Sequence, residues 1–223
     1  MITPEIKNKI EAIVNVFETG SPTGGYSTVV IYKDGKNDSR QITYGRSQTT
    51  EQGNLRSLIE MYVAHEGQYA KELKPYIPRI LKTPLVDDKD FIALLKKAGN
   101  DPVMRDTQDQ FFDIVYYTPA LHFFDGYKFL QPLSLLVIYD SYIHSGSVPS
   151  FLRQRFTEAP PSMGGDEKKW VTEYTKTRND WLANNTKVIL RKTVYRTACF
   201  LEQIRRDNWS LAAPVDAHGV MVP

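Results

Sequence analysis

The most constraining feature of the sequence is the run from Leu133 to His144, in which most residues are apolar. A helix that is apolar on nearly every side must be enclosed by other elements of the protein. Pro132, directly before the run, is suited to the first position of a helix. The run therefore predicts a central buried helix.

Three charged residues, Asp140, Arg178 and Arg191, lie on predicted helical faces that are otherwise apolar. A buried charge without a partner is very costly, so each of them needs an opposite charge nearby. Because arginine can bind a carboxylate bidentately, we expect Asp140 to lie between Arg178 and Arg191. The alternative is a catalytic Asp140, but two flanking arginines would lower its pKa and keep it from donating a proton.

Most of the remaining chain is predicted to be helical. Thr3 and Pro4 are suited to the start of a first helix, whose apolar stripe reaches Phe17. Asp101 followed by Pro102 marks a second start of the same kind. Apolar periodicity indicates further helices over about 55–63, 91–98, 166–181 and 187–206.

One β-hairpin is predicted near the N-terminus. Residues 26–32 are rich in β-branched and aromatic types, residues 33–39 have turn composition, and residues 40–44 form a short returning strand. We find no other convincing β signal. The sequence therefore predicts a mainly α fold with a small β-hairpin, in the α+β class.

Two carboxylates twenty residues apart, Glu18 and Asp38, are the candidate catalytic residues of the sequence. Glu18 lies at the end of the first helix, and Asp38 lies in the hairpin turn. Cleavage of a glycosidic bond needs one carboxyl group as proton donor and a second to activate water or act as nucleophile. The plainer alternative is a solvated glutamate at a helix end and a turn-forming aspartate.

The sequence gives little support to nucleic-acid binding, a membrane span or a metal site. The net charge of +2 over 223 residues gives no bulk attraction to nucleic acid, and no apolar run approaches the roughly 18 residues of a membrane span. No His or Cys pair has metal-ligand spacing, so we expect no metal and no cofactor. The N-terminus has no secretory signal pattern, which suggests a processed fragment or a chain that begins in a cytoplasm.

Several short motifs, in order, resemble the family-46 chitosanases of the lysozyme-like superfamily. The segment Asp38-Ser39-Arg40-Gln41-Ile42-Thr43-Tyr44-Gly45 resembles the family's Asp-Gly-Arg-Gly-Tyr-Thr-Gly-Gly. Glu18 matches the family's general acid. Further matches, which extend the likeness over most of the chain, are Val115-Tyr116-Tyr117-Thr118-Pro119-Ala120, Tyr139-Asp140-Ser141-Tyr142-Ile143-His144-Ser145-Gly146 and Gly164-Gly165-Asp166-Glu167.

The resemblance implies an endo-acting, inverting glycoside hydrolase that cleaves β-1,4 bonds of an aminosugar polysaccharide. It makes Glu18 the general acid, Asp38 the general base and Thr43 the hydroxyl that positions water. It makes Arg40 a residue of the substrate cleft and places Asn54 at a substrate-binding position. Tyr44 and Tyr116 are further substrate-binding candidates, because their rings could stack on a sugar. The resemblance also matches the family's buried Asp–Arg–Arg cluster to Asp140, Arg178 and Arg191.

The same resemblance implies one catalytic domain over residues 1–223, with two helical lobes flanking a substrate cleft bordered by residues 18–50. We expect a monomer that binds polysaccharide, without nucleic acid, and that acts outside the cell or on a cell wall.

Two departures leave the substrate open. Asn54 stands where family members often have an aspartate that binds the substrate's ammonium group, and a second cleft carboxylate falls on Asn185. Chitosan is a polycation, so fewer acidic cleft residues favour the related polymer peptidoglycan, cleaved by a muramidase or endolysin-type enzyme. A third reading, a glycan-binding domain without turnover, is weakened because Glu18, Asp38 and Thr43 are all present.

Overall fold

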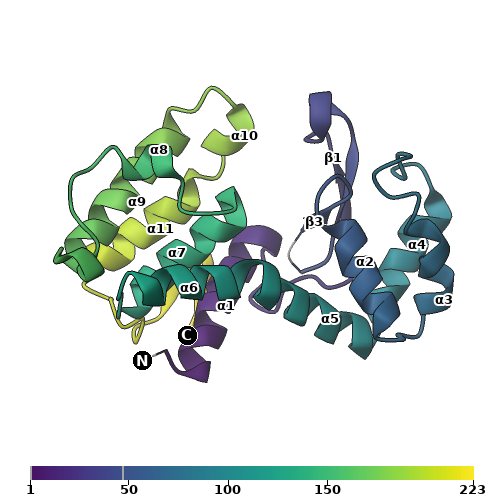
Figure 1. Ribbon diagram of the computed structural model, residues 1–223, viewed down its shortest axis with the longest axis horizontal. Coiled ribbons are helices and arrows are strands. Elements are labelled where there is room, and N and C mark those ends of the chain that lie inside the picture. The colour runs from purple at the N-terminus through teal and green to yellow at the C-terminus, as the bar shows by residue number, and fades with distance from the viewer. Residues whose placement is uncertain (1, 47) are drawn as a thin grey trace. The chain divides into compact units, whose positions relative to one another are not determined.

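The computed structural model describes residues 2–46 and 48–223, most of them helical (Figure 1). They divide into two compact units. The first holds residues up to Phe17 and from Ile114 onward, and the second is Glu18–Asp113. The boundary falls within helix α1 (Pro4–Thr19) and at the start of the π-helical segment η3 (Asp113–Tyr117). The expected fold class, mainly helical with a small β-hairpin, is confirmed.

The first unit is organised around α7 (Pro132–Ser145). All residues from Leu133 to Ser141 are buried, and α7 contacts α6, α9 and α11. The predicted central helix is therefore confirmed. The elements of this unit after η3 are α6 (Thr118–Gly126), α7, α8 (Ser150–Arg153), η4 (Pro161–Met163), α9 (Glu167–Ala183), α10 (Val188–Arg191), α11 (Val194–Arg205), β4 (Val215–Ala217) and β5 (Val220–Val222).

The C-terminal part of this unit differs from the prediction in two ways. The single helix expected over about 187–206 is two helices, α10 and α11. At the break the Thr193 hydroxyl donates to the carbonyl of Leu190 (2.7 Å), a side-chain bond that competes with continued helix. The antiparallel pair β4–β5 was not predicted, because three-residue strands are too short to show an alternating pattern.

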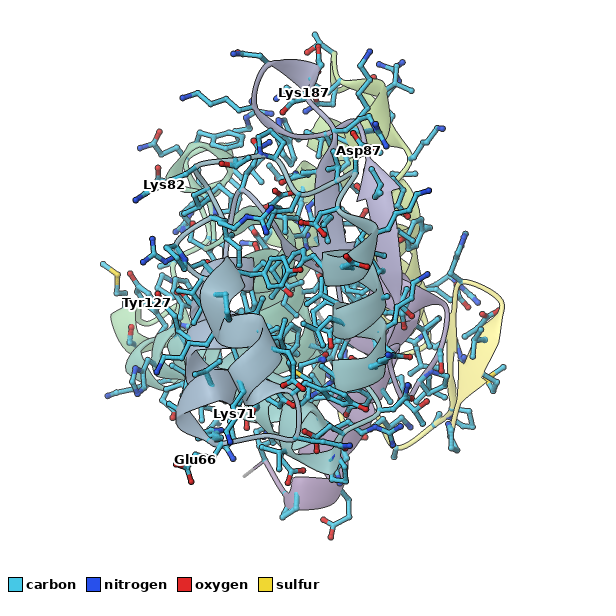
Figure 2. The ribbon with its side chains drawn as sticks, turned by 90° about the vertical axis from the view of Figure 1, so that its right-hand side faces the viewer. Glu66, Lys71, Lys82, Asp87, Tyr127 and Lys187 are labelled. Carbon is cyan, nitrogen blue, oxygen red and sulfur yellow. The ribbon has the colours of Figure 1, made fainter. Side chains whose placement is uncertain are left out.

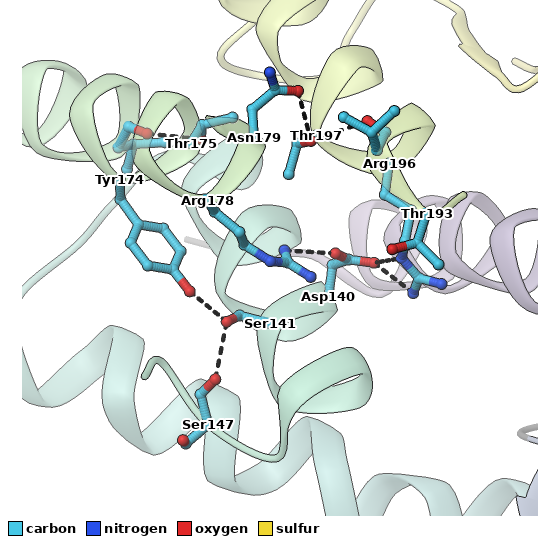
Figure 3. Close-up of polar contacts among 12 residues, drawn as sticks. Asp140, Ser141, Ser147, Tyr174, Thr175, Arg178, Asn179, Thr193, Arg196 and Thr197 are labelled. Atoms are coloured by element: carbon cyan, nitrogen blue, oxygen red, sulfur yellow. Dashed lines mark hydrogen bonds and ion pairs between the residues drawn. The ribbon is translucent and has the colours of Figure 1, made fainter. Parts of the chain in front are cut away.

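A buried ion cluster joins three helices of the first unit (Figure 3). Asp140 on α7 accepts from Nη1 of Arg178 on α9 (2.7 Å) and from Nε of Arg196 on α11 (2.8 Å). Burial alone would raise the pKa of Asp140, but the two guanidiniums outweigh that effect and bring the pKa to about 2. The carboxylate therefore stays ionised, as expected of a structural residue.

The prediction that Arg191 is the second arginine beside Asp140 was wrong. Arg191 lies on α10, where its Nη1 donates to the carbonyls of Asn185 (2.6 Å) and Thr186 (3.2 Å). The prediction assumed one continuous helix, in which Arg191 shares a stripe with later apolar residues. Because the helix breaks before α11, it is Arg196, 2% exposed, that reaches Asp140.

The second unit combines a small antiparallel sheet with a group of helices. The sheet has the order β1 (Val29–Tyr32), β2 (Gln41–Tyr44) and β3 (Thr49–Thr50). The predicted hairpin is present, with Val30 opposite Thr43. The helical elements are η1 (Lys36–Asp38), α2 (Leu55–Ala64), α3 (Ala70–Leu73), η2 (Lys74–Tyr76), α4 (Lys89–Ala98) and α5 (Pro102–Phe112).

The start of the first strand and the start of α5 show how local chemistry sets these bounds. The first strand begins at Val29 rather than at Tyr26, because residues 25–28 form a turn in which the amide of Thr28 donates to the carbonyl of Gly25 (3.0 Å). Asp101 caps α5 by accepting from the amide of Val103 (3.1 Å), as the sequence predicts. The helices among the described residues are each too short or too polar to cross a bilayer.

Candidate functional site

Glu18 lies in the last turn of α1 and is half-buried. The C-terminal end of a helix carries a partial negative charge, so a glutamate there is less favourable than a neutral or basic residue. The last turn of α1 contains no basic residue. Helix stability therefore does not explain the choice of glutamate at this position, which suits a functional carboxyl group.

The residue before Glu18 is firmly anchored within the first unit. The Phe17 ring makes edge-to-face contacts with Tyr195 (5.7 Å between centroids) and Phe200 (5.8 Å). The Tyr195 hydroxyl donates to the Phe17 carbonyl (2.8 Å). The Arg196 guanidinium lies 5.2 Å from the Phe17 ring centroid. Because Asp140 binds this guanidinium, the buried ion cluster helps to fix α1 at Phe17.

Asp38 lies at the exposed tip of the β1–β2 hairpin, in the short helical turn η1. Asn37 (φ 58°) and Asp38 (φ 57°) both adopt the left-handed conformation. Asn and Asp are the side chains that tolerate this conformation best. The amide of Gly35 donates to the carbonyl of Ser39 (2.9 Å) and closes the turn. The turn therefore presents an exposed carboxylate on a well-defined backbone.

Gln52, which follows β3, clamps the turn from both sides of Asp38. Its Oε1 accepts from the amide of Lys36 (2.6 Å), and its Nε2 donates to the Ser39 hydroxyl (2.9 Å). A Cβ atom on Gly35 would come within 2.5 Å of the Gln52 Nε2, so a side chain at position 35 would disturb the clamp. The role of Gln52 could not be predicted from the sequence, because nothing in the local pattern brings residue 52 beside residue 38.

Glu51 fixes the strand that follows the turn. Only 4% of this residue is exposed. Its two carboxylate oxygens accept from backbone amides, Oε2 from Ile42 on β2 (3.2 Å) and Oε1 from Leu85 (2.7 Å). Charge-assisted bonds of this kind are stronger than neutral ones. Glu51 therefore ties β2 to the loop before α4, a role that could not be predicted from the sequence either.

Thr43 lies on β2 between the buried residues Ile42 and Tyr44, and only 3% of its surface is exposed. Its hydroxyl oxygen is buried and has no hydrogen-bond partner among the described residues. A buried hydroxyl without a partner costs free energy. The Thr43 hydroxyl has almost no surface open to solvent, and its expected role in positioning water stays a prediction.

The structure contradicts one of the four predicted substrate-binding residues. Tyr44 is completely buried, on the same face of β2 as Ile42, so its ring cannot stack on a sugar. Desolvation raises the pKa of its hydroxyl above the usual value. The prediction failed because both faces of β2 are buried, whereas a hairpin strand was expected to leave one face open.

The other three substrate-binding candidates stay predictions. Arg40 is exposed, and its Nη1 donates to Oδ1 of Asp87 (3.2 Å). Asn54 occupies the N-cap position of α2 and is partly exposed. Tyr116 lies in η3 and is also partly exposed, but it belongs to the first unit, whereas the others belong to the second.

A groove of about 460 Å³ lies beside the turn that carries Asp38. Among the residues that line it are the cations Lys36, Arg40 and Lys82. Lys82 and Asp87 extend from the surface of the second unit (Figure 2). The lining also includes Glu51, so three cationic residues and one acidic residue face this groove beside Asp38. Among the described residues no group of three or more His, Cys, Asp or Glu side chains could hold a metal ion.

Known proteins share both the sequence pattern and the fold. A sequence profile described as Glycosyl hydrolase family 46 matches residues 12–215. A chitosanase of Bacillus subtilis (strain 168) is 27% identical over 228 residues, which cover 94% of this chain and 80% of that protein.

Two solved chitosanases illustrate the structural likeness. The native enzyme of Bacillus subtilis MY002 has a TM-score of 0.87 at 23% identity, with both chains covered completely. The Gynuella sunshinyii enzyme, solved with chitotetraose, has a TM-score of 0.83 at 20% identity and covers 100% of this chain and 99% of its own.

These structural matches show the fold, and the profile match, which includes both Glu18 and Asp38, shows the family. The chain belongs to glycosyl hydrolase family 46 and is a glycoside hydrolase.

Proposed function

We propose that this enzyme is an endo-acting chitosanase that hydrolyses β-1,4 bonds with inversion of configuration. Glu18 is the general acid, Asp38 is the general base, and Thr43 helps to position the attacking water. Support for the substrate comes from the relatives, which are chitosanases, one of them solved with chitotetraose. Such polymers lie outside cells, so the proposal implies an enzyme that works there.

In this mechanism Glu18 donates a proton to the oxygen of the leaving sugar. Asp38 takes a proton from a water molecule, which attacks the anomeric carbon from the opposite face of the ring. The Thr43 hydroxyl holds that water in line. An inverting pair of carboxyl groups stands about 6.5–9.5 Å apart, which leaves room for the water between base and sugar.

The observation that carries the proposal is the construction of the turn at Asp38. Two consecutive non-glycine residues adopt the left-handed conformation there, and Gln52 clamps the backbone on either side. Backbone conformations of this kind cluster at functional sites, where the surrounding structure maintains them. The clamp fixes the backbone from which the exposed Asp38 carboxylate extends, as suits a base that must meet a water molecule.

A second candidate function, hydrolysis of peptidoglycan, is favoured by the groove beside Asp38. Lys36, Arg40 and Lys82 line it, and cations repel the ammonium groups of chitosan but attract the carboxylates of cell-wall glycans. Arg40 is paired with Asp87, which reduces this effect. We retain chitosan as the main substrate because the known relatives act on it.

The release of reducing ends tests the choice between substrates. The protein is incubated with soluble chitosan and, separately, with purified bacterial cell walls, with Glu18→Gln as the matched inactive control. Release from chitosan alone supports the main proposal. Release from cell walls alone replaces it with the second candidate, and no release from either overturns both.

A further inference from the structure

The hydrogen bond from Tyr195 to the last turn of α1 acts on the peptide group that precedes Glu18. The final four carbonyls of an α-helix have no amide partner within the helix. Phe17 is the third residue from the end of α1, so its carbonyl is one of these four. The hydroxyl of Tyr195, on α11, donates to it (2.8 Å). Because the carbonyl carbon of Phe17 is bonded to the amide nitrogen of Glu18, this contact fixes the peptide from which the Glu18 side chain extends.

Two neighbouring rings restrain Tyr195. The ring of Phe17 packs edge-to-face against it, as described above. The imidazole of His218 stacks on it, with the ring centroids 4.1 Å apart and the ring planes at 21°. Packed rings of this kind attract each other and limit the rotation of the tyrosine about its side-chain bonds. The stack with His218 therefore limits where the Tyr195 hydroxyl can point.

His218 is an unusual residue for the turn that carries it. Ala217 pairs with Val220, so His218 and Gly219 form the two-residue loop between β4 and β5. Both adopt positive φ angles, 55° for His218 and 88° for Gly219. Loops of this kind favour asparagine or aspartate followed by glycine. Asparagine would therefore serve the turn, and the histidine adds the aromatic ring that stacks on Tyr195.

The β4–β5 hairpin is attached to the same helix that carries Tyr195. The thiol of Cys199, one turn after Tyr195 on α11, donates to the carbonyl of Asp216 on β4 (3.3 Å). Ala217 has no exposed surface. The amide of Gly219 donates to Oδ1 of Asp216 (2.6 Å) and closes the turn. These contacts hold the tip of the hairpin, and with it the His218 ring, against α11.

We propose that Tyr195 is a positioning residue for the general acid and that His218 holds Tyr195 in place. The His218 ring restrains Tyr195, the Tyr195 hydroxyl fixes the peptide before Glu18, and this peptide sets the direction in which the Glu18 carboxyl group leaves α1. Both residues act through Glu18, so the inference rests on the proposed function, in which Glu18 protonates the leaving sugar. Proton transfer requires close alignment, and a misplacement of about 1 Å can cost about 10²-fold in rate.

Two substrates with different leaving groups test this inference. The glucosamine tetramer needs a proton on the oxygen of its leaving sugar, whereas the 2,4-dinitrophenyl glycoside of the glucosamine trimer releases a weakly basic phenolate that needs none. Tyr195→Phe removes one oxygen atom and keeps the ring contacts with Phe17 and His218. We expect kcat on the tetramer to fall by about tenfold at constant KM, and kcat on the dinitrophenyl glycoside to change by less than about twofold.

Further variants separate positioning from stability. His218→Asn keeps a residue that suits the turn but removes the ring, and should lower kcat on the tetramer by about threefold. The double variant should be no slower than Tyr195→Phe alone, because both changes interrupt the same chain of contacts. Tyr127→Phe is the matched control. It removes a hydroxyl from a ring that is 37% exposed and packs on Phe123 (4.6 Å between centroids), and should match the parent on both substrates. Each single variant should lower Tm by no more than about 4 °C.

The inference is overturned if Tyr195→Phe matches the parent on the tetramer, if it loses rate equally on both substrates, or if the effect of His218→Asn adds in full in the double variant. Glu18→Gln distinguishes this failure from failure of the proposed function, since it should lose rate on the tetramer alone. If it does and Tyr195→Phe does not, only the inference fails. If Glu18→Gln shows no such difference, or the parent leaves the tetramer intact, the proposed function fails and the inference fails with it.

Discussion

Asp140→Asn is the substitution whose effect on stability follows most directly from the structure. Asp140 and Arg178 have no exposed side-chain surface, and the Arg196 side chain is 3% exposed. Asparagine has nearly the same shape as aspartate but no charge, so the variant would keep the packing and remove the anion that both buried guanidiniums bind. Breaking a buried ion pair in this way costs about 3–5 kcal/mol.

That cost is a large part of the total stability of a domain, which is about 5–15 kcal/mol. For a chain of this length each kcal/mol lowers Tm by about 2–4 °C, so we expect Tm to fall by about 10 °C. Thermal unfolding followed by circular dichroism measures the change. Asp125→Asn, at an exposed position of α6, is the matched control and should stay within about 0.5 kcal/mol of the parent. A loss below about 1 kcal/mol in Asp140→Asn would refute the reasoning.

Three further predictions concern the catalytic residues and pH. Glu18→Gln and Asp38→Asn should each lower kcat on chitosan by about 10²–10⁴-fold, as kinetic measurements would show. Thermal melts should show an unchanged Tm for both, since asparagine also tolerates the left-handed backbone at position 38. Gln52→Ala should lower kcat by about 10–100-fold at constant KM by loosening the turn, whereas Gln110→Ala, exposed on α5, should change neither constant. Burial, followed by the nearby arginines, lowers the pKa of His144 from 6.5 to about 3. The unfolded chain therefore binds the proton first, and the free energy of unfolding should fall as pH drops from about 6.5 to 3, by up to about 1.4 kcal/mol per pH unit. Denaturant titrations across this range should show a flatter profile for His144→Gln, and an unchanged profile would contradict the assignment.

The sequence predicted the elements whose signals are local. An apolar run predicted α7, an Asp–Pro pair predicted the start of α5, and turn composition placed the hairpin around Asp38. Each of these signals depends on residues close together in the chain, where helix caps, turn residues and periodicity act.

The features that could not be predicted from the sequence depend on contacts between distant residues. Arg196 replaces Arg191 beside Asp140 because a helix break, marked by one threonine side chain, shifts the register of the charged residues. Gln52 reaches the turn at Asp38 only because the chain folds back after β3. Periodicity within one segment does not contain this information.

The burial of Tyr44 has a similar origin. A strand in a hairpin often has one polar face, but all four residues of β2 are buried. The covering elements come from parts of the sequence far from the strand, so alternation within the strand could not reveal them. The candidate carboxylates were easier to find, because their positions at a helix end and at a turn are local features.

The central claim is that Glu18 acts as the acid and that Asp38 acts as the base, with the attacking water between Asp38 and the sugar. The most direct test is the anomeric configuration of the first product released from a glucosamine hexamer, read by proton magnetic resonance before mutarotation. Water delivered by Asp38 to the face opposite the leaving group yields the α-anomer. A β-anomer as the initial product would contradict the account, because it requires a nucleophilic carboxylate and a covalent intermediate.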